Sequence, residues 1–273
     1  MTRLTGDVAV VTGSGRGFGK AIATRLAAEG AAVTVTSRTK LELDKVVEEI
    51  ESAGGRALAV SGDATNREDV VRVVAATREK LGPITLMVNN AGVPGPFGPI
   101  GVVDPDAWWA AQAIHVRAPF LFMSAVLPQM KDRRRGRIIN IVSLRVHKLT
   151  PFLSAYCLGK AAEFRLTQLA NAEARDYGVA TFAVDPGSVI TSMAEDTMAS
   201  PDAQLWLPDM VELLRELKGR PDDGAVLAKC TQRCVDLASG RYDALSGSYI
   251  SRDDNLEHML AQVGGQSSEL KPA

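Results

Sequence analysis

The stretch V-A-V-V-T-G-S-G-R-G-F-G, residues 8–19, joins a short apolar run to a glycine-rich turn. The run Val8–Thr12 is apolar on both faces and rich in valine, which is typical of a buried parallel strand. Gly13, Gly17 and Gly19 permit a tight turn and let the backbone approach a bound anion closely. A helix that begins near Gly17 would direct its N-terminal amides and its dipole at that anion. The stretch therefore predicts a strand, a phosphate-binding turn and a helix.

Similar apolar runs alternate with longer helical patterns along most of the chain. The runs expected to be strands are Val8–Thr12, Ala32–Thr36, Ala57–Ser61, Leu86–Asn89, Ile138–Val142 and Val179–Val184, and the helical patterns cover residues 17–29, 40–53, 66–81, 107–130 and 154–177. Repeated strand–helix alternation favours an α/β fold with a single Rossmann-type doubly wound parallel sheet flanked by helices. Right-handed crossovers would place the carboxyl ends of all strands at one edge of this sheet.

The chain has 273 residues, which fits one dinucleotide-binding oxidoreductase domain over residues 1–263. Residues 199–224 form an irregular insertion after the sixth strand. We interpret it as a lid over a substrate pocket, and a helix pair packed on the body is the alternative. Residues 264–273 are polar and are expected to form a loose C-terminal tail.

Composition excludes several classes of function. With 31 basic and 32 acidic residues, the formal net charge is −1, so no broad electrostatic footprint for nucleic acid or an anionic membrane is expected. Three cysteines do not indicate a disulfide framework, and Cys230 and Cys234 have no histidine nearby to complete a metal site. We find neither a signal peptide nor an apolar stretch of about 18 residues, so a cytoplasmic enzyme is expected.

The end of the second expected strand bears on the choice of nucleotide. A carboxylate at this point would bind a free ribose 2′-hydroxyl, but the strand ends Thr36-Ser37-Arg38. Arg38, and Arg16 within the glycine-rich turn, could instead bind a 2′-phosphate. NADP is therefore favoured over NAD, unless both arginines are ordinary surface residues. Asp63, after the third strand, could accept a hydrogen bond from an adenine amino group or could cap a turn.

A second group of residues lies in the middle of the chain. Tyr156 and Lys160 are four residues apart, and Ser143 precedes Tyr156 by thirteen. Residues four apart on a helix point the same way, so an ammonium at Lys160 would stabilise a phenolate at Tyr156. An isolated pair of this kind could be an ordinary helix pair. Ser143, at the end of an expected buried strand, and the upstream turn instead favour a proton-transfer site.

Six segments, in this order, resemble the short-chain dehydrogenase/reductase family. They are T-G-S-G-R-G-F-G (12–19), Asp63, N-N-A-G (89–92), I-I-N-I-V-S (138–143), Y-C-L-G-K (156–160) and D-P-G-S-V-I-T (185–191). The resemblance implies an oxidoreductase that transfers a hydride between a nicotinamide and a secondary alcohol or its ketone. Together with the two arginines it predicts an NADP-dependent enzyme acting on a CH–OH group.

The resemblance also implies roles for individual residues. Tyr156 would exchange a proton with the substrate oxygen, Ser143 would hydrogen-bond that oxygen, and Lys160 would bind the nicotinamide ribose. Residues 90–92 would line the cofactor groove, and residues 186–191 would hold the nicotinamide carboxamide. The candidate cofactor-binding residues are Gly13, Ser14, Arg16, Gly17, Phe18, Gly19, Ser37, Arg38, Asp63, Ala64, Asn90, Ala91, Gly92, Tyr156, Lys160, Pro186, Gly187, Val189 and Thr191.

Two positions depart from the family pattern. His115 stands where the family usually has an asparagine that helps hold a water between the lysine and solvent. An imidazole could take over this proton relay, which makes His115 a fourth candidate catalytic residue, or the ring only packs. Residues 244–256 lack the frequent Asp-Gly-Gly of the family, which puts its usual C-terminal packing in doubt. A homodimer or homotetramer is still expected.

The substrate is expected to be a small-molecule alcohol or ketone. An apolar or aromatic wall is suggested by Pro94, Phe97, Phe152, Met193 and Trp206, although core packing explains single members equally well. Two other functions stay open, namely an epimerase or dehydratase on the same scaffold and a non-catalytic NADP-sensing module. Stoichiometric NADPH consumption would separate them from a reductase.

Overall fold

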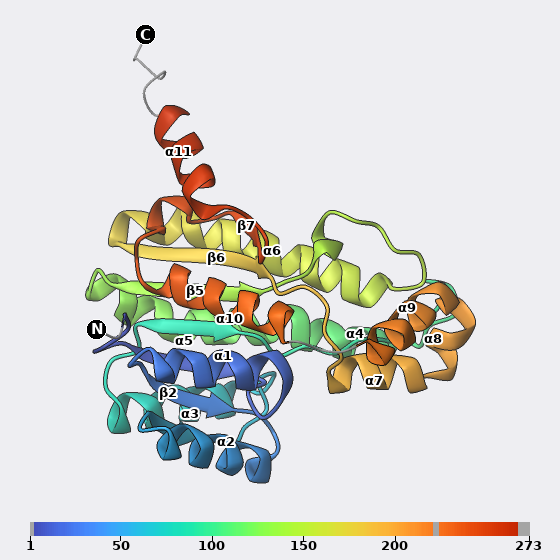
Figure 1. The fold of residues 1–273 in the computed structure, drawn as a ribbon, viewed down its shortest axis with the longest axis horizontal. Coiled ribbons are helices and arrows are strands. Elements are labelled where there is room, and N and C mark those ends of the chain that lie inside the picture. Colours follow the sequence, from blue (N-terminus) through green and yellow to red (C-terminus); the bar gives the residue numbers. More distant parts are fainter. Residues whose placement is uncertain (1–2, 221–223, 267–273) are drawn as a thin grey trace.

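A parallel sheet with helices on both faces organises the protein (Figure 1). The computed structural model describes residues 3–220 and 224–266. Seven strands, in the order β3-β2-β1-β4-β5-β6-β7, pair in parallel throughout. Their bounds are β1 Val8–Thr12, β2 Ala32–Thr36, β3 Arg56–Ala59, β4 Leu86–Asn89, β5 Gly136–Ile141, β6 Val179–Asp185 and β7 Tyr249–Ser251. The doubly wound sheet expected from the sequence is confirmed.

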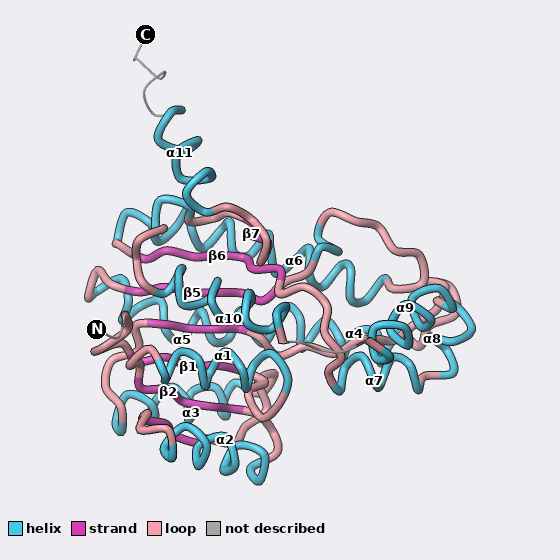
Figure 2. Tube along the Cα trace, viewed as in Figure 1, coloured by secondary structure: helices cyan, strands magenta, loops and turns pink. Residues whose placement is uncertain are grey.

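Two layers of helices cover the sheet (Figure 2). One face carries α1 (Gly17–Ala28), α2 (Lys40–Ser52) and α10 (Ala225–Ala238), and the other carries α3 (Arg67–Lys80), α5 (Ala118–Asp132) and α6 (Ser154–Ala174). Asn66 caps α3 by accepting a hydrogen bond from the Asp69 amide at 3.0 Å, which pairs an amide of the first helical turn. α11 (Leu256–Gln266) projects from the sheet end that carries β7 (Figure 1).

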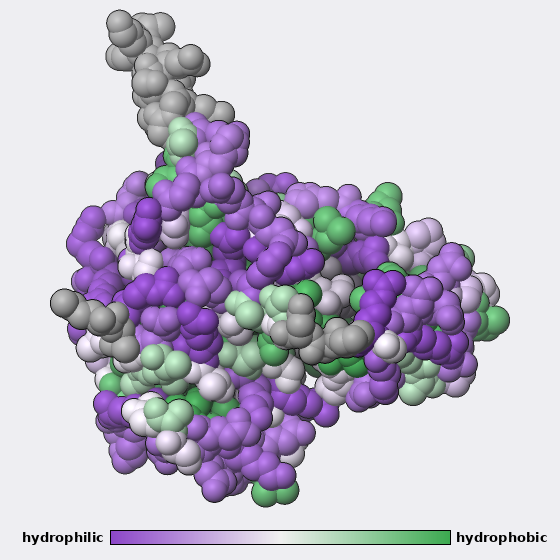
Figure 3. Space-filling view, in the orientation of Figure 1, coloured by the Kyte–Doolittle hydropathy of each residue, from purple (hydrophilic) through white to green (hydrophobic). Residues whose placement is uncertain are grey.

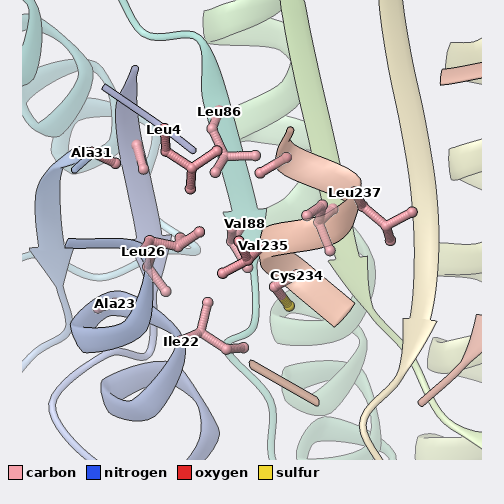
Figure 4. Packing of buried hydrophobic residues seen from close by; sticks show 14 of the residues in the cluster. Leu4, Ile22, Ala23, Leu26, Ala31, Leu86, Val88, Cys234, Val235 and Leu237 are labelled. Atoms are coloured by element: carbon pink, nitrogen blue, oxygen red, sulfur yellow. The ribbon is translucent and has the colours of Figure 1, made fainter. Parts of the chain in front are cut away.

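Strand β1 shows how both layers are held. Ala9 and Val11 point into the core beneath α1 and α10, whereas Val8 and Val10 point into the core beneath α3 and α5. Successive strand side chains alternate between faces, so a strand covered on both sides must be apolar at every position. Figure 4 shows the first of these cores, in which Cys234 packs with Ile22 and Val235. Cys230 and Cys234 are free and buried, and both thiols pack in this core.

All six strands expected from the sequence are present. β1, β2 and β4 have the expected bounds, while β3, β5 and β6 differ from expectation by one to two residues at their ends. β7 was missed altogether, because Tyr249–Ser251 is only three residues long and has one fully buried member. Such a segment is too short to display a strand periodicity.

The expected helix over residues 107–130 is interrupted. α4 (Pro105–Gln112) passes through the π-helical turn η1 (Ala113–Arg117) into α5. The expectation that no apolar stretch reaches about 18 residues is wrong for this segment: by length and hydropathy alone, Pro105–Asp132 could cross a membrane. In the fold, however, Phe122, Met123, Val126 and Met130 of this segment pack against the sheet. In this structure, the segment therefore belongs to the helical layer that covers one face of the sheet.

The insertion after β6 is helical. α7 (Ser192–Ala199), α8 (Pro201–Trp206) and α9 (Pro208–Gly219) form an extension beyond the carboxyl edge of the sheet (Figure 1). Figure 3 shows a mainly hydrophilic face, with hydrophobic residues emerging toward this extension. The lid interpretation stays a prediction. The prediction of a loose tail over residues 264–273 is wrong for residues 264–266, which continue α11. Residues 267–273 lie outside the described part of the chain.

Candidate active site

The glycine-rich turn after β1 has the geometry that the sequence predicts. Gly13 and Gly17 have φ values of +62° and +57°, in the left-handed region that side chains other than glycine rarely adopt. At Gly19, a Cβ atom would collide with the carbonyl oxygen of Gly13. The chain therefore folds back tightly before α1, and the first amides of this helix face the turn.

Hydrogen bonds brace the turn from inside. The Ser14 hydroxyl is fully buried, donates to the Val11 carbonyl at 2.8 Å and accepts from the Thr36 amide at 2.8 Å. The Thr12 hydroxyl accepts from the amides of Asn90 and Ala91 at 2.9 and 3.1 Å. The carboxyl ends of β1, β2 and β4 are thus tied together. Because the strand order reverses between β1 and β4, this is the point where doubly wound folds bind nucleotides.

The two arginines proposed to select the nucleotide differ in their surroundings. Arg38 is exposed, and no ion pair to it occurs among the residues that the structure describes. The Arg16 guanidinium lies 3.9 Å from the Glu42 carboxylate. A Cβ atom at Gly15 would meet Glu42 at 2.7 Å and the Ser37 hydroxyl at 3.3 Å. Glu42, on α2, therefore places a negative charge beside the turn.

The third strand leads into the same region. One carboxylate oxygen of Asp63 accepts hydrogen bonds from both the amide and the hydroxyl of Thr65 at 2.8 Å. This confirms the turn-capping role that the sequence left open, and the adenine contact stays a prediction. Ala64 is half-buried and packs against the core beneath α3.

The loop after β6 approaches the glycine-rich turn. Thr191 lies against the glycine-rich turn, because a Cβ atom at Gly17 would meet its methyl group at 3.4 Å. Gly187 has a φ of +81° and donates its amide to the Asp185 carboxylate at 3.1 Å. Pro186 is buried and Val189 is half-buried in this loop. Segments far apart in the sequence thus meet at one edge of the sheet.

Lys160 is the most constrained side chain of the site. It is buried, and its ammonium donates to the Ile141 carbonyl at 2.7 Å and to the Glu163 carboxylate at 2.8 Å. Ile141 ends β5, two residues before Ser143. A buried ammonium is costly unless it is paired, so these two acceptors hold it at the carboxyl end of β5.

Tyr156 lies one turn before Lys160, near the start of α6. This helix start is fixed by Trp108 and Gln112 of α4. The Trp108 indole donates to the Ser154 hydroxyl at 3.1 Å, and the Gln112 amide donates to the Ala155 carbonyl at 2.9 Å. The phenol is half-buried, and its ring meets the His115 ring edge-on with centroids 5.3 Å apart. The structure therefore brings Tyr156, Lys160 and His115 together.

His115 is fully buried within the π-helical turn. Its Nε2 lies 2.9 Å from the Val93 carbonyl, which can only accept, so this nitrogen carries the hydrogen. Its Nδ1 is a buried acceptor without a partner among the described residues. Burial, together with the charge of Lys160, lowers the pKa of His115 to about 3. This favours a neutral ring, and the proton relay stays a prediction.

Ser143 follows β5 directly. Its hydroxyl accepts a hydrogen bond from the Arg145 amide at 3.3 Å and so begins the short 3₁₀ turn η2 (Leu144–Val146). The Arg145 guanidinium donates to the Thr150 hydroxyl at 2.7 Å, which holds the loop after the strand together. Ser143 is half-buried, so its hydroxyl can still reach a substrate.

Comparison with known proteins identifies the family. The family model described as short chain dehydrogenase matches residues 7–202. This chain belongs to the short-chain dehydrogenase family. The match covers every segment described above, from the glycine-rich turn to the loop after β6, and it confirms the resemblance seen in the sequence. The protein is thus an enzyme of the short-chain dehydrogenase/reductase class of oxidoreductases.

Individual relatives agree with this assignment. A short chain dehydrogenase of Pseudocercospora fijiensis is 32% identical and aligns over 96% of this chain and 84% of its own length. A 3-oxoacyl-[acyl-carrier-protein] reductase of Synechocystis is 36% identical over 75% of this chain and 83% of its own. A gluconate 5-dehydrogenase from Burkholderia cenocepacia, solved in complex with NADP and tartrate, is 26% identical, with a TM-score of 0.78 over 94% of this chain and 97% of its own.

Within this short-chain dehydrogenase, an apolar cluster borders the Tyr156 ring. Tyr156 and Cys157 pack against buried residues that include Phe97, Leu153 and Leu207. Phe152 and Trp206 bring their rings to 5.3 Å. The structure therefore gathers Phe97, Phe152 and Trp206, three of the five residues proposed as an apolar wall, around this end of α6.

Three further residues of the site were not found from the sequence. Glu163 pairs with Lys160, Glu42 approaches the glycine-rich turn, and the Arg252 guanidinium packs against Gly187. The spacing of Lys160 and Glu163 allows an i,i+3 pair, but the same spacing is common on exposed helices. Glu42 and Arg252 reach the site through tertiary packing, for which the sequence carries no local signal.

Proposed function

We propose that this chain is an NADP-dependent oxidoreductase that transfers a hydride between the nicotinamide and a secondary alcohol or ketone. The observation that carries the proposal is the fixed ammonium of Lys160, which lies one helical turn from the Tyr156 phenol at the edge of the sheet that holds the glycine-rich turn. A phenol beside a cation can exchange its proton far more readily than a free one.

In this proposal, the side chains handle the proton. Tyr156 gives its hydrogen to the carbonyl oxygen during reduction and takes one from the alcohol during oxidation. The Ser143 hydroxyl donates to the same oxygen and stabilises its developing negative charge. Lys160 stabilises the phenolate that results. The bound nicotinamide would supply or accept the hydride.

The residues present fit a dinucleotide. The positive φ values at Gly13 and Gly17 and the crowded Gly19 leave backbone, and no side chain, facing the turn. The Ser37 hydroxyl is buried without a partner among the described residues, next to Gly15 and Glu42. Arg16 and Arg38 supply two exposed cations for a 2′-phosphate, and the Burkholderia cenocepacia relative binds NADP. These observations support NADP over NAD, while Glu42 weakens the preference.

The test is the consumption of NADPH with a panel of ketones, followed by absorbance. We expect wild type to oxidise NADPH stoichiometrically and Tyr156→Phe to be slower by about 10²–10⁴-fold, the usual worth of a positioned acid. Tyr177→Phe, at a tyrosine exposed on the surface, is the matched control and should retain the wild-type rate. Equal rates for wild type and Tyr156→Phe would exclude Tyr156 as the acid.

A further inference from the structure

One face of α6 carries the proton-transfer site and continues beyond it into the core. Tyr156, Lys160, Glu163 and Thr167 follow one another at spacings of three and four residues, so they line one side of the helix. Lys160, Glu163 and Thr167 are all buried. The carboxylate of Glu163 is unexpected at a buried position, because a buried charge needs a partner.

The partner of Glu163 is Lys160. The Glu163 carboxylate accepts from the Lys160 ammonium at 2.8 Å, and the two side chains are only 2% and 4% exposed, respectively. The second acceptor of the ammonium, the Ile141 carbonyl, belongs to β5. Glu163 and β5 therefore hold Lys160 from two sides. Neither side chain can swing into solvent without losing a buried hydrogen bond.

The pair also decides the charge near Tyr156. An ammonium alone contributes one positive charge, whereas an ammonium with an ionised carboxylate contributes no net charge. A phenolate gains more from the first arrangement than from the second. The protonation state of Glu163 thus changes the net charge that acts on the phenol, although Glu163 is seven residues along the helix from Tyr156.

We propose that Glu163 is a positioning residue of this active site, which anchors the Lys160 ammonium and sets the net charge felt by Tyr156. The inference rests on the proposed function of Tyr156 and Lys160, and it adds a regulating group to that site. Glu163 touches neither the substrate nor the cofactor in this proposal. It acts by holding the ammonium and by the charge that it adds to the pair.

The surroundings of Glu163 support a charge that changes near neutral pH. Burial raises the pKa of Glu163 to about 7, although the ammonium of Lys160 opposes the rise. Lys160 is the charged group that acts on Glu163 from their common helix, and β5 contributes a neutral carbonyl among the described residues. His115, from η1, faces Lys160 and remains neutral because its pKa is about 3. Glu163 is therefore the group of this network that titrates in the physiological range.

The test is a titration of the phenol by ultraviolet difference absorbance in the protein without substrate. Subtracting the spectrum of Tyr156→Phe isolates the signal of Tyr156. Glu163→Gln keeps an oxygen that accepts from Lys160 but removes the negative charge. We expect its tyrosinate signal to develop at lower pH than in wild type, by on the order of one pH unit for charges about 10 Å apart. Glu173→Gln, at an exposed glutamate of the same helix, should titrate like wild type.

If the Tyr156 phenol ionises at the same pH in Glu163→Gln and in wild type, the claim that Glu163 sets the charge felt by Tyr156 is overturned. A purely structural role would change the thermal unfolding temperature of Glu163→Gln and leave the titration unmoved. If Glu163→Gln does not fold, the anchoring is tested on wild type labelled with ¹⁵N-lysine. A buried, paired ammonium gives a proton resonance protected from exchange, and this resonance must vanish in Lys160→Arg. Its absence from wild type would overturn the proposal.

The two proposals can fail separately. The titration needs no substrate, so it reports on Glu163 even if none of the ketones is reduced. Conversely, if wild type reduces ketones while Glu163→Gln and wild type titrate at the same pH, the proposed function stands. Only the proposed role of Glu163 then fails.

Discussion

Gly159 lies directly against His115, and a Cβ atom at Gly159 would come within 2.6 Å of the Cβ atom of His115. Only a hydrogen atom fits between α6 and the π-helical turn at this point. The close approach brings the imidazole to the edge of the Tyr156 ring. The spacing between these two helical segments therefore determines the shape of the site beside the phenol.

Gly159→Ala should destabilise the protein, because the added methyl group has no room. Overpacking of this kind costs about 1–3 kcal/mol, and the free energy of unfolding in urea will measure it. Gly219→Ala is the matched control, since a Cβ atom there meets no atom within 4 Å. Equal stability for Gly159→Ala and wild type would show that the π-helical turn can move away freely.

His115 should make the fold sensitive to acid. Its pKa is lowered from 6.5 to about 3. Between these two pH values, the unfolded chain therefore binds a proton at His115 and the folded protein does not. The stability that it contributes is present above pH 6.5 and is lost as the pH falls toward 3. The slope is about 1.4 kcal/mol per pH unit. In urea titrations at a series of pH values, the free energy of unfolding of wild type minus that of His115→Asn should therefore decrease as the pH falls from 6.5 toward 3.

Glu163 should act in the opposite direction. Its pKa is raised from 4.5 to about 7, so the folded protein holds a proton that the unfolded chain releases. Its contribution to stability is present below pH 4.5 and is lost as the pH rises toward 7. Between about pH 4.5 and 6.5 the two slopes nearly cancel in wild type. His115→Asn should then lose stability with rising pH, and Glu163→Gln should gain it. A flat profile for both variants would contradict the two shifts.

Glu42 should oppose the binding of a 2′-phosphate, given the proposed cofactor. Its carboxylate lies beside Arg16 and the glycine-rich turn. Glu42→Gln removes this charge, and we expect its Kd for NADP to fall about three- to tenfold, with a smaller change for NAD, since a partly exposed charge pair is weak. Isothermal titration calorimetry measures both constants. Glu48→Gln, exposed on the same helix, serves as control. An unchanged ratio of the two constants would place Glu42 outside the nucleotide subsite.

Much of the site could be predicted because its signals are local. The turn after β1 is readable from Gly13, Gly17 and Gly19, since each glycine meets a backbone requirement. Tyr156 and Lys160 share a helix face by spacing alone. The expected compartment and the homodimer or homotetramer stay predictions, because neither follows from a single chain.

Other features could not be predicted because they depend on what packs against a residue. Glu163 has the spacing of an ordinary surface pair, and only the docking of α6 on β5 buries it. The π-helical turn places His115 against Gly159, which are forty-four residues apart in the sequence. β7 is recognised as a strand only from its pairing with β6.

The amino-acid sequence by itself determined the alternation of strands and helices, the glycine-rich turn and the order of the candidate catalytic residues, because backbone preferences and residue periodicity act over a few positions. The tertiary structure alone decided which charges lie together in the dry interior. The packing of α6 on β5 buries the Lys160–Glu163 pair and adds the Ile141 carbonyl as a second acceptor. Burial changes the electrostatic free energy of a charge, and no local pattern encodes burial of this kind.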